Sequence, residues 1–203
     1  MIEKRSETNG EAENLIADIC TKSYLKRPSI KDAAFIAISS FMNNAIFVKN
    51  KPGHVYECDA AMLFMKSSSF RWMISGTSRV LYFVDKKLSA QSDLREYPRI
   101  GIKPSYTPEP GPVMKCEKGE NAFFLCSKAL TDKIGVEGIE KALSGASNQD
   151  EWMAAVEEMA GDTDFAAQAL IMPEKMRMPI TKILIPVILL LIILVVVLIF
   201  VLK

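Results

Sequence analysis

The spacing of apolar and polar residues predicts two helices followed by a series of strands. Apolar side chains recur with a helical period over residues 11–26 and again over residues 32–46. Ser29 and Asp32 form an S-x-x-D string, which predicts a capped start for the second helix. From Tyr56 onward the period changes to two, as expected for strands with one buried face.

Further strands and helices follow the same logic. Strands are predicted over residues 56–64, 70–74, 79–84, 122–127 and 166–172, and helices over residues 136–143 and 149–160. Asn148 and Glu151 form a capping pair for the last helix. Residues 98–112 contain five prolines and are predicted to form an irregular loop. This order predicts an α+β domain over residues 11–172, with a sheet-rich core flanked by helices.

An apolar run near the carboxyl terminus predicts a membrane anchor. The run begins at Ile183, ends at Leu202 and contains no charge. A helix of that length is about 30 Å long, which matches the hydrocarbon core of a bilayer. Residues 173–182 form a basic linker before it, whereas only Lys203 follows it, so the positive-inside rule places the amino-terminal domain in the cytoplasm. The alternative, a buried core helix, would need apolar partners on every side.

Composition narrows the possible functions. The 203 residues include 25 Lys and Arg against 24 Asp and Glu, without a basic run that would hold nucleic acid. The four cysteines are scattered, which indicates free thiols in a reducing compartment. Residues 1–10 are polar, so we expect a disordered end without a signal peptide. The single histidine, His54, has no evident catalytic partner in the sequence.

Four short strings resemble the metal-dependent serine/threonine protein phosphatases, also called protein phosphatase 2C or the PPM-type family. In chain order they are Met42-Asn43-Asn44-Ala45-Ile46 followed by Gly53, Gly76-Thr77-Ser78-Arg79, the run from Phe124 to Asp132, and Thr163-Asp164-Phe165-Ala166. The resemblance implies two stacked sheets flanked by helix pairs. It also implies that aspartates at the strand ends hold Mg²⁺ or Mn²⁺, which activate a water for attack on a phosphoester.

At three positions where this family has a metal-binding aspartate, the chain has Thr77, Lys128 and Thr163. Hard divalent cations need anionic oxygen ligands. A lysine about 4 Å from such an ion would repel it by roughly 8 kcal/mol at an effective dielectric constant near 20. We therefore expect no metal, no other cofactor and no catalytic residue at this site.

The family's first strands also have no clear counterpart. The sequence contains no D-G-x-G-G string, and Arg27 to Asp32 has the spacing of the family's R-x-x-N-E-D string without its Asn and Glu. Because that segment fits the start of a helix better, we expect a shortened two-sheet sandwich.

Two roles for Lys128 remain open. Its ammonium could occupy the vacated metal space and neutralise a residual acidic cluster of Asp132, Asp162 and Asp164. Alternatively, it is a solvated surface lysine, because a buried ammonium needs well-placed partners.

The sequence thus predicts a membrane-anchored, catalytically inactive phosphatase-like module that binds a protein partner, such as a phosphoprotein or a kinase, and not nucleic acid. One alternative is an active Mg²⁺- or Mn²⁺-dependent phosphatase whose ligands are rearranged among Asp59, Asp132, Asp162 and Asp164. Another is an anchored domain of unrelated fold.

Overall fold

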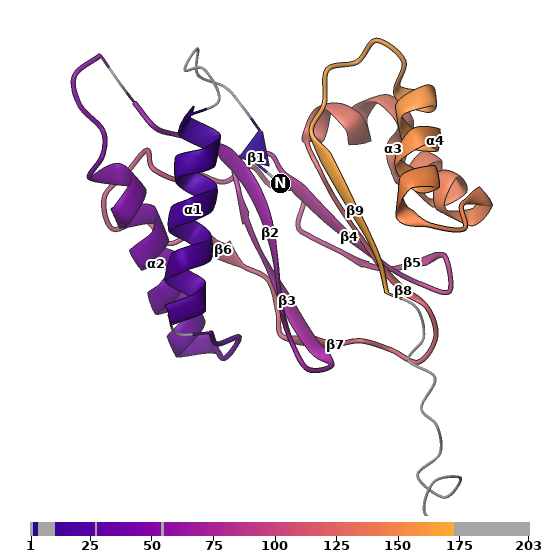
Figure 1. Cartoon of the computed structure of the whole chain (residues 1–203), viewed down its shortest axis with the longest axis horizontal. Coiled ribbons are helices and arrows are strands. Elements are labelled where there is room, and N and C mark those ends of the chain that lie inside the picture. Colours follow the sequence, from indigo (N-terminus) through magenta and orange to yellow (C-terminus); the bar gives the residue numbers. More distant parts are fainter. Residues whose placement is uncertain (1, 4–10, 27, 54, 173–203) are drawn as a thin grey trace, which may run out of the picture. The chain divides into compact units, whose positions relative to one another are not determined.

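The computed structural model describes residues 2–3, 11–26, 28–53 and 55–172, which form a four-layered unit of helices and sheets (Figure 1). The helices are α1 (Glu11–Lys26), α2 (Asp32–Phe47), α3 (Lys128–Gly145) and α4 (Gln149–Ala160). The strands are β1 (Ile2–Glu3), β2 (Asp59–Lys66), β3 (Ser69–Ser75), β4 (Arg79–Val84), β5 (Lys87–Gln91), β6 (Glu109–Pro110), β7 (Met114–Lys115), β8 (Asn121–Cys126) and β9 (Ala167–Met172).

The strands form two antiparallel sheets. The first has the order β1-β2-β3-β6, with β7 also paired to β3, and the second has the order β5-β4-β8-β9. Helices α1 and α2 cover the outer face of the first sheet, and α3 and α4 cover the outer face of the second (Figure 1). The two inner faces therefore pack on each other, as in other layered α+β domains.

Alternation along the strands explains this packing. In β4, Val80 and Tyr82 join the cluster between the sheets, whereas Leu81 and Phe83 join the cluster under α3 and α4. Tyr82 stacks on Phe123 of β8, with ring centroids 4.9 Å apart. Because successive side chains point to opposite faces of a strand, one apolar run can supply two cores.

Each helix pair adds a core of its own. Phe35, Met42 and Ile46 of α2 are fully buried against the first sheet. On the other side Trp152 of α4 is fully buried, and its indole N–H donates to the carbonyl of Ile139 at 3.1 Å. This hydrogen bond satisfies the one polar atom of a large buried aromatic side chain.

Several sequence predictions are confirmed. Helices α1 and α4 and strand β4 have the predicted bounds. Asn148 caps α4 by accepting from the amides of Asp150 and Glu151, as expected for a capping box. The prediction for the start of α2 is wrong, because Lys31 occupies the N-cap without a side-chain hydrogen bond. Instead, the Asp32 carboxylate lies 3.1 Å from the buried guanidinium of Arg71.

Other elements were missed or misplaced. Helix α3 begins at Lys128 rather than at residue 136. Gly135 has non-helical backbone angles (φ 69°, ψ 170°) and interrupts the helical spacing of apolar residues, so only the part after it was predicted. Strand β5 was not predicted, although its five residues alternate between exposed and half-buried positions; its pairing with β4 establishes it. Ile2–Glu3 lies in the segment expected to be disordered, but it pairs with β2.

Some predictions concern residues outside the described ones. These are the membrane span 183–202, the basic linker 173–182, most of residues 1–10, Arg27 and His54. Within the described residues, no helix combines the length and apolar character needed to cross a bilayer.

The buried thiols predict how stability depends on pH. Burial raises the pKa of Cys20 and of Cys126 to about 12. Above pH 9 the unfolded chain loses these thiol protons while the folded chain retains them, so stability falls as the pH rises from 9 towards 12. Replacing both residues with alanine should reduce this decline by roughly 1–2 kcal/mol per thiol between pH 8 and 10.5.

Urea unfolding of the full chain in detergent micelles, followed by tryptophan fluorescence, measures the change. Alanine at Cys116 serves as the comparison: burial raises the pKa of this half-buried thiol less than those of Cys20 and Cys126, so the substitution should reduce the decline less. Equal declines in the parent chain and the Cys20→Ala/Cys126→Ala variant would contradict the prediction.

Candidate functional site

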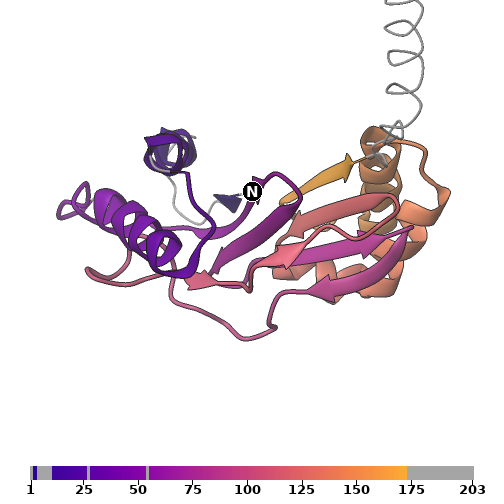
Figure 2. The same cartoon turned by 90° about the horizontal axis from the view of Figure 1, so that it is seen from below.

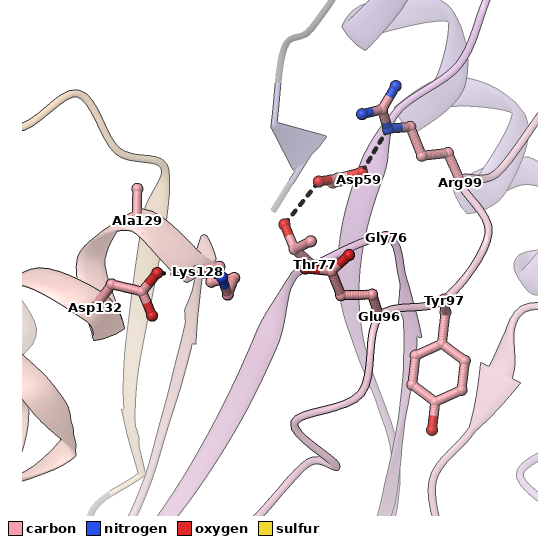
Figure 3. Close-up of a pocket in the computed structure, with 9 residues that line it drawn as sticks. All are labelled: Asp59, Gly76, Thr77, Glu96, Tyr97, Arg99, Lys128, Ala129 and Asp132. Carbon is pink, nitrogen blue, oxygen red and sulfur yellow. Dashed lines mark hydrogen bonds and ion pairs between the residues drawn. The ribbon is translucent and has the colours of Figure 1, made fainter.

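A cavity of about 430 Å³ lies beside the beginning of β2 and the turn that follows β3 (Figure 3). Four segments far apart in the sequence line it. They contribute Asp59 from β2, Gly76 and Thr77 from the turn after β3, Glu96, Tyr97 and Arg99 from the loop between β5 and β6, and Lys128, Ala129 and Asp132 from α3.

Asp59 is the buried centre of this cavity. Its side chain is fully buried, and its carboxylate accepts hydrogen bonds from Thr77 Oγ1 at 2.9 Å and Arg99 Nε at 3.1 Å (Figure 3). The same guanidinium donates from Nη1 to Glu57 Oε1 at 2.6 Å. A carboxylate removed from water is costly unless it is paired and hydrogen-bonded, so Arg99 and Thr77 compensate for the burial of Asp59.

The backbone of the turn after β3 brings these groups together. Gly76 has a φ of +65°, and a Cβ at this position would overlap the Asp59 carboxylate. The Gly76 amide donates to the carbonyl of Pro98 at 3.3 Å, and the Tyr97 amide donates to the carbonyl of Gly76 at 2.9 Å. The turn that carries Thr77 therefore also holds the loop that carries Arg99.

The guanidinium of Arg99 stays protonated in its partly buried position. Burial alone lowers the pKa of its guanidinium, but the hydrogen bond to Glu57 and the nearby charges of Asp59 and Glu57 outweigh burial, so the pKa is raised. Arg99 therefore remains cationic at any pH at which the protein folds.

Lys128 lies at the beginning of α3, after the N-cap Ser127. Its ammonium is 3.3 Å from the Asp132 carboxylate one turn later, and the two side chains are 42% and 63% exposed. Such an exposed pair contributes only a few tenths of a kcal/mol, and its Lys-before-Asp order is the less favourable one on a helix. Lys128 thus lines the cavity as a half-buried cation whose described ion pair is with Asp132.

The structure brings together only part of the predicted site. Thr77, Lys128 and Asp132 line one cavity. Thr163 is half-buried in the segment between α4 and β9, where Asp162 and Asp164 are exposed, and none of the three lines the cavity. Within the described residues, no group of three histidine, cysteine, aspartate or glutamate side chains is arranged to hold a metal ion.

Sequence reasoning missed the principal cation of the site. Arg99 lies in the proline-rich loop for which no chemistry was predicted, and Asp59 was named only as a ligand for the alternative phosphatase. Their contact depends on a β-bridge between Cys58 and Ile100, which links residues too distant for any local pattern to reveal. The one available signal was an arginine between a proline and apolar residues in a long loop.

Comparison with known proteins identifies the fold. No family model matches the chain, and no curated protein matches its sequence. Among solved structures, PppA, a regulatory component of the type VI secretion system in Pseudomonas aeruginosa, is 13% identical with a TM-score of 0.63, covering 85% of this chain and 83% of PppA. The PPM Ser-Thr phosphatase MsPP from Mycobacterium smegmatis is 13% identical with a TM-score of 0.65, covering 82% and 84%.

The catalytic domain of the phosphatase PstP, solved with two manganese ions, is 15% identical with a TM-score of 0.61, covering 80% of this chain and 81% of that one. This chain has the PPM phosphatase fold. The predicted α+β architecture of two antiparallel sheets with helices is therefore confirmed, and the alternative of an unrelated fold is wrong. At this low identity the PPM fold does not specify chemistry, which has to be derived from the residues of the cavity.

The two cations of the cavity should differ in their effect on stability. Replacing Arg99 with methionine removes the guanidinium that donates to the buried Asp59 carboxylate, which should destabilise the protein by about 1–3 kcal/mol. Replacing Lys128 with alanine should change stability by less than about 0.5 kcal/mol. Denaturant unfolding of both variants measures the difference.

An Arg99→Met/Asp59→Asn double variant tests the pairing itself. Neutralising both partners should recover part of the loss, since no uncompensated charge remains buried. A double variant whose loss equals the sum of the two single losses would show that the pair is not coupled.

Proposed function

We propose that this protein is a membrane-anchored, catalytically inactive phosphatase-like module that binds a protein partner. The observation that supports this proposal best is the internal pairing of the cavity: Asp59 is bound by Arg99 and Thr77, and Asp132 lies beside Lys128. The chain thus pairs two carboxylates of the cavity with its own cations, Arg99 and Lys128.

The energetics disfavour a metal at this position. Two-metal phosphoryl chemistry needs several carboxylates that hold both ions close together. A divalent ion about 4 Å from Arg99 would be repelled by roughly 8 kcal/mol at an effective dielectric constant near 20. To bind Asp59, the ion would also have to displace a guanidinium that Glu57 holds from its other side.

The anchor is part of the proposal on the strength of the sequence. The uncharged run from Ile183 to Leu202 has the length of a membrane span. Confinement to a membrane raises the effective concentration of the module toward other membrane proteins. Even a weak interface with a phosphoprotein or a kinase at the cytoplasmic face would then be occupied.

Metal binding and turnover test the catalytic part of the proposal. The full chain in detergent micelles should give no Mn²⁺ binding heat and no hydrolysis of p-nitrophenyl phosphate or of a phosphothreonine peptide above the blank. We expect no metal binding because Arg99 already donates to the buried Asp59 carboxylate.

Aspartate-to-asparagine variants make this test decisive. Turnover that EDTA abolishes and Asp59→Asn removes would overturn the proposal in favour of an active phosphatase with rearranged ligands. If Asp59→Asn and Asp132→Asn leave turnover unchanged, Asp162→Asn and Asp164→Asn test the other candidate ligands. Turnover that is unchanged in all four variants would identify a contaminating phosphatase, which leaves the chain itself inactive as proposed.

Membrane extraction tests the anchor. After alkaline carbonate treatment, the full chain should stay with the membrane pellet, because a spanning helix is not released by breaking electrostatic contacts. A chain that ends at residue 182 should move to the supernatant. Release of the full chain by carbonate would contradict the predicted span.

A further inference from the structure

Both sheets end in an open strand on the same rim of the sandwich. Among the described residues, β1 pairs with β2 at Ala60 and Asp59, and β9 is the last strand of the second sheet. Within the described part of the chain, no strand pairs with the outer side of residues 62–65 in β2 or 168–170 in β9. Figure 2 shows β2 and β9 along one rim, with β5 on the opposite side.

A groove of about 650 Å³ lies along these two edges and is flanked by α1. We call it the rim groove. It is lined by residues 62–65 and 168–170, by Leu125, and by one face of α1 that includes Ala17, Thr21 and Leu25. The described residues that line it include no carboxylate, ammonium or guanidinium. Leu25 is 68% exposed there, so the groove offers apolar surface to an occupant.

The opposite edge of the second sheet has a different character. β5 begins with Lys87, whose ammonium pairs with Glu140 at 3.0 Å, and its residues alternate between exposed and half-buried. Charges and short length are ordinary protection for an edge strand against pairing with other chains. Residues 62–65 and the whole of β9 carry no charge, so the edges on the rim groove lack this protection.

We propose that the rim groove accepts an extended, uncharged β-strand from a partner protein. β1 already pairs antiparallel to β2 on this same outer edge, so a strand bound at residues 62–65 continues an existing ladder. At about 3.3 Å per residue, that edge accommodates four to five residues of the partner. Backbone hydrogen bonds supply affinity in this mode of recognition, and side-chain pockets supply specificity.

The two walls of the rim groove, the sheet edges on one side and α1 on the other, determine which partner side chains fit. Leu63, Met65 and Leu170 are partly buried members of the cluster between the sheets, so residues that point inward meet apolar carbon. Tyr24 and Met62 are partly buried members of the cluster under α1. Partner residues that point outward, towards α1, therefore also meet apolar carbon. A strand buried on both faces is a continuous apolar run rather than an alternating one.

A second copy of this chain fits the rim groove poorly. Its own open edges lie beside α1 in the same way, so the helices of two copies would meet before their strands approached the 4.7–4.9 Å spacing of a sheet. A single extended segment has no such obstruction. The lack of ionised lining groups likewise excludes a strand with charged residues inside the paired segment, because those charges would be desolvated without partners.

This inference rests on the proposed partner-binding function, for which it names the surface. Its test is separate from the metal and phosphatase measurements, because the groove and the cavity around Asp59 share no lining residue. Failure of the peptide test below would remove the rim groove and leave the inactive-module proposal standing. Metal-dependent turnover would overturn the inactive-module proposal and leave the rim groove as a candidate binding surface.

The probe is the labelled peptide KKVIVIVKK, whose five central residues are apolar and β-forming and whose lysines keep it soluble. The full chain in lipid nanodiscs should bind it, and the backbone amides of residues 62–65 or 168–170 should become protected in hydrogen exchange. The peptide KKVIPIVKK, in which a central proline removes an N–H donor, should bind at least tenfold more weakly.

Two arginine substitutions provide a matched pair of variants. Gln168 and Gln91 are exposed glutamines on the two opposite edge strands of the same sheet. Gln168→Arg places a charge in the rim groove and should weaken peptide binding at least tenfold, as should Thr21→Arg. Gln91→Arg should leave binding unchanged, and thermal unfolding should show that all three variants remain folded.

Several outcomes would overturn the proposal. These are equal binding by Gln168→Arg and Gln91→Arg, equal binding of the two peptides, or no amide protection at a peptide concentration of about 1 mM. A dimer that Gln168→Arg dissociates would assign the groove to a second copy. Binding that appears only when residues 173–203 are removed would assign it to the chain's own carboxyl-terminal segment.

Discussion

The burial of one carboxylate constrains the candidate site of this protein. Asp59 begins β2 with no exposed surface, packed against Gly76 so closely that no side chain fits at that position. A negative charge in such a place has to be compensated, and the compensation comes from Arg99, which lies forty residues further along the chain. The turn after β3 and the loop between β5 and β6 are hydrogen-bonded to each other in the positions that make this contact possible.

The same pair links stability to the proposed loss of catalysis. In a two-metal enzyme, carboxylates at strand ends are held apart by repulsion until ions bind them. Here a guanidinium and a hydroxyl each donate to one oxygen of Asp59. A fold shared with phosphatases does not by itself imply phosphatase chemistry, and the internal pairing of Asp59 supports the proposed inactive module.

The two edge strands of the second sheet differ in their protection against pairing with other strands. β5 ends the sheet with a charged strand that pairs with Glu140 of α3. β9 ends it with uncharged residues that border a groove. Since edge strands without protection pair readily with other strands, this asymmetry supports the proposed partner binding at a surface that is separate from the cavity around Asp59. Anchoring would place that edge near the proteins of one membrane.

The sequence alone determined the features that depend on local periodicity. The apolar run from Arg79 to Val84 predicted β4 with its observed bounds, and the Asn148 cap begins α4 where the pattern predicted. Short strings in order were enough to indicate the PPM fold, because they mark strand ends and turns that recur with the fold. The missing aspartates at Thr77, Lys128 and Thr163 were visible for the same reason.

Only the tertiary structure decided which charges meet. Lys128 looked like the cation of the site, yet it is 42% exposed beside Asp132, while Arg99 from a loop without any pattern holds the buried Asp59. The groove between β2 and β9 was equally hidden, since an open edge is a property of two sheets and not of either strand. Periodicity reports the faces of one element, whereas ion pairs and edges depend on the distances between elements, which form only when the whole core packs.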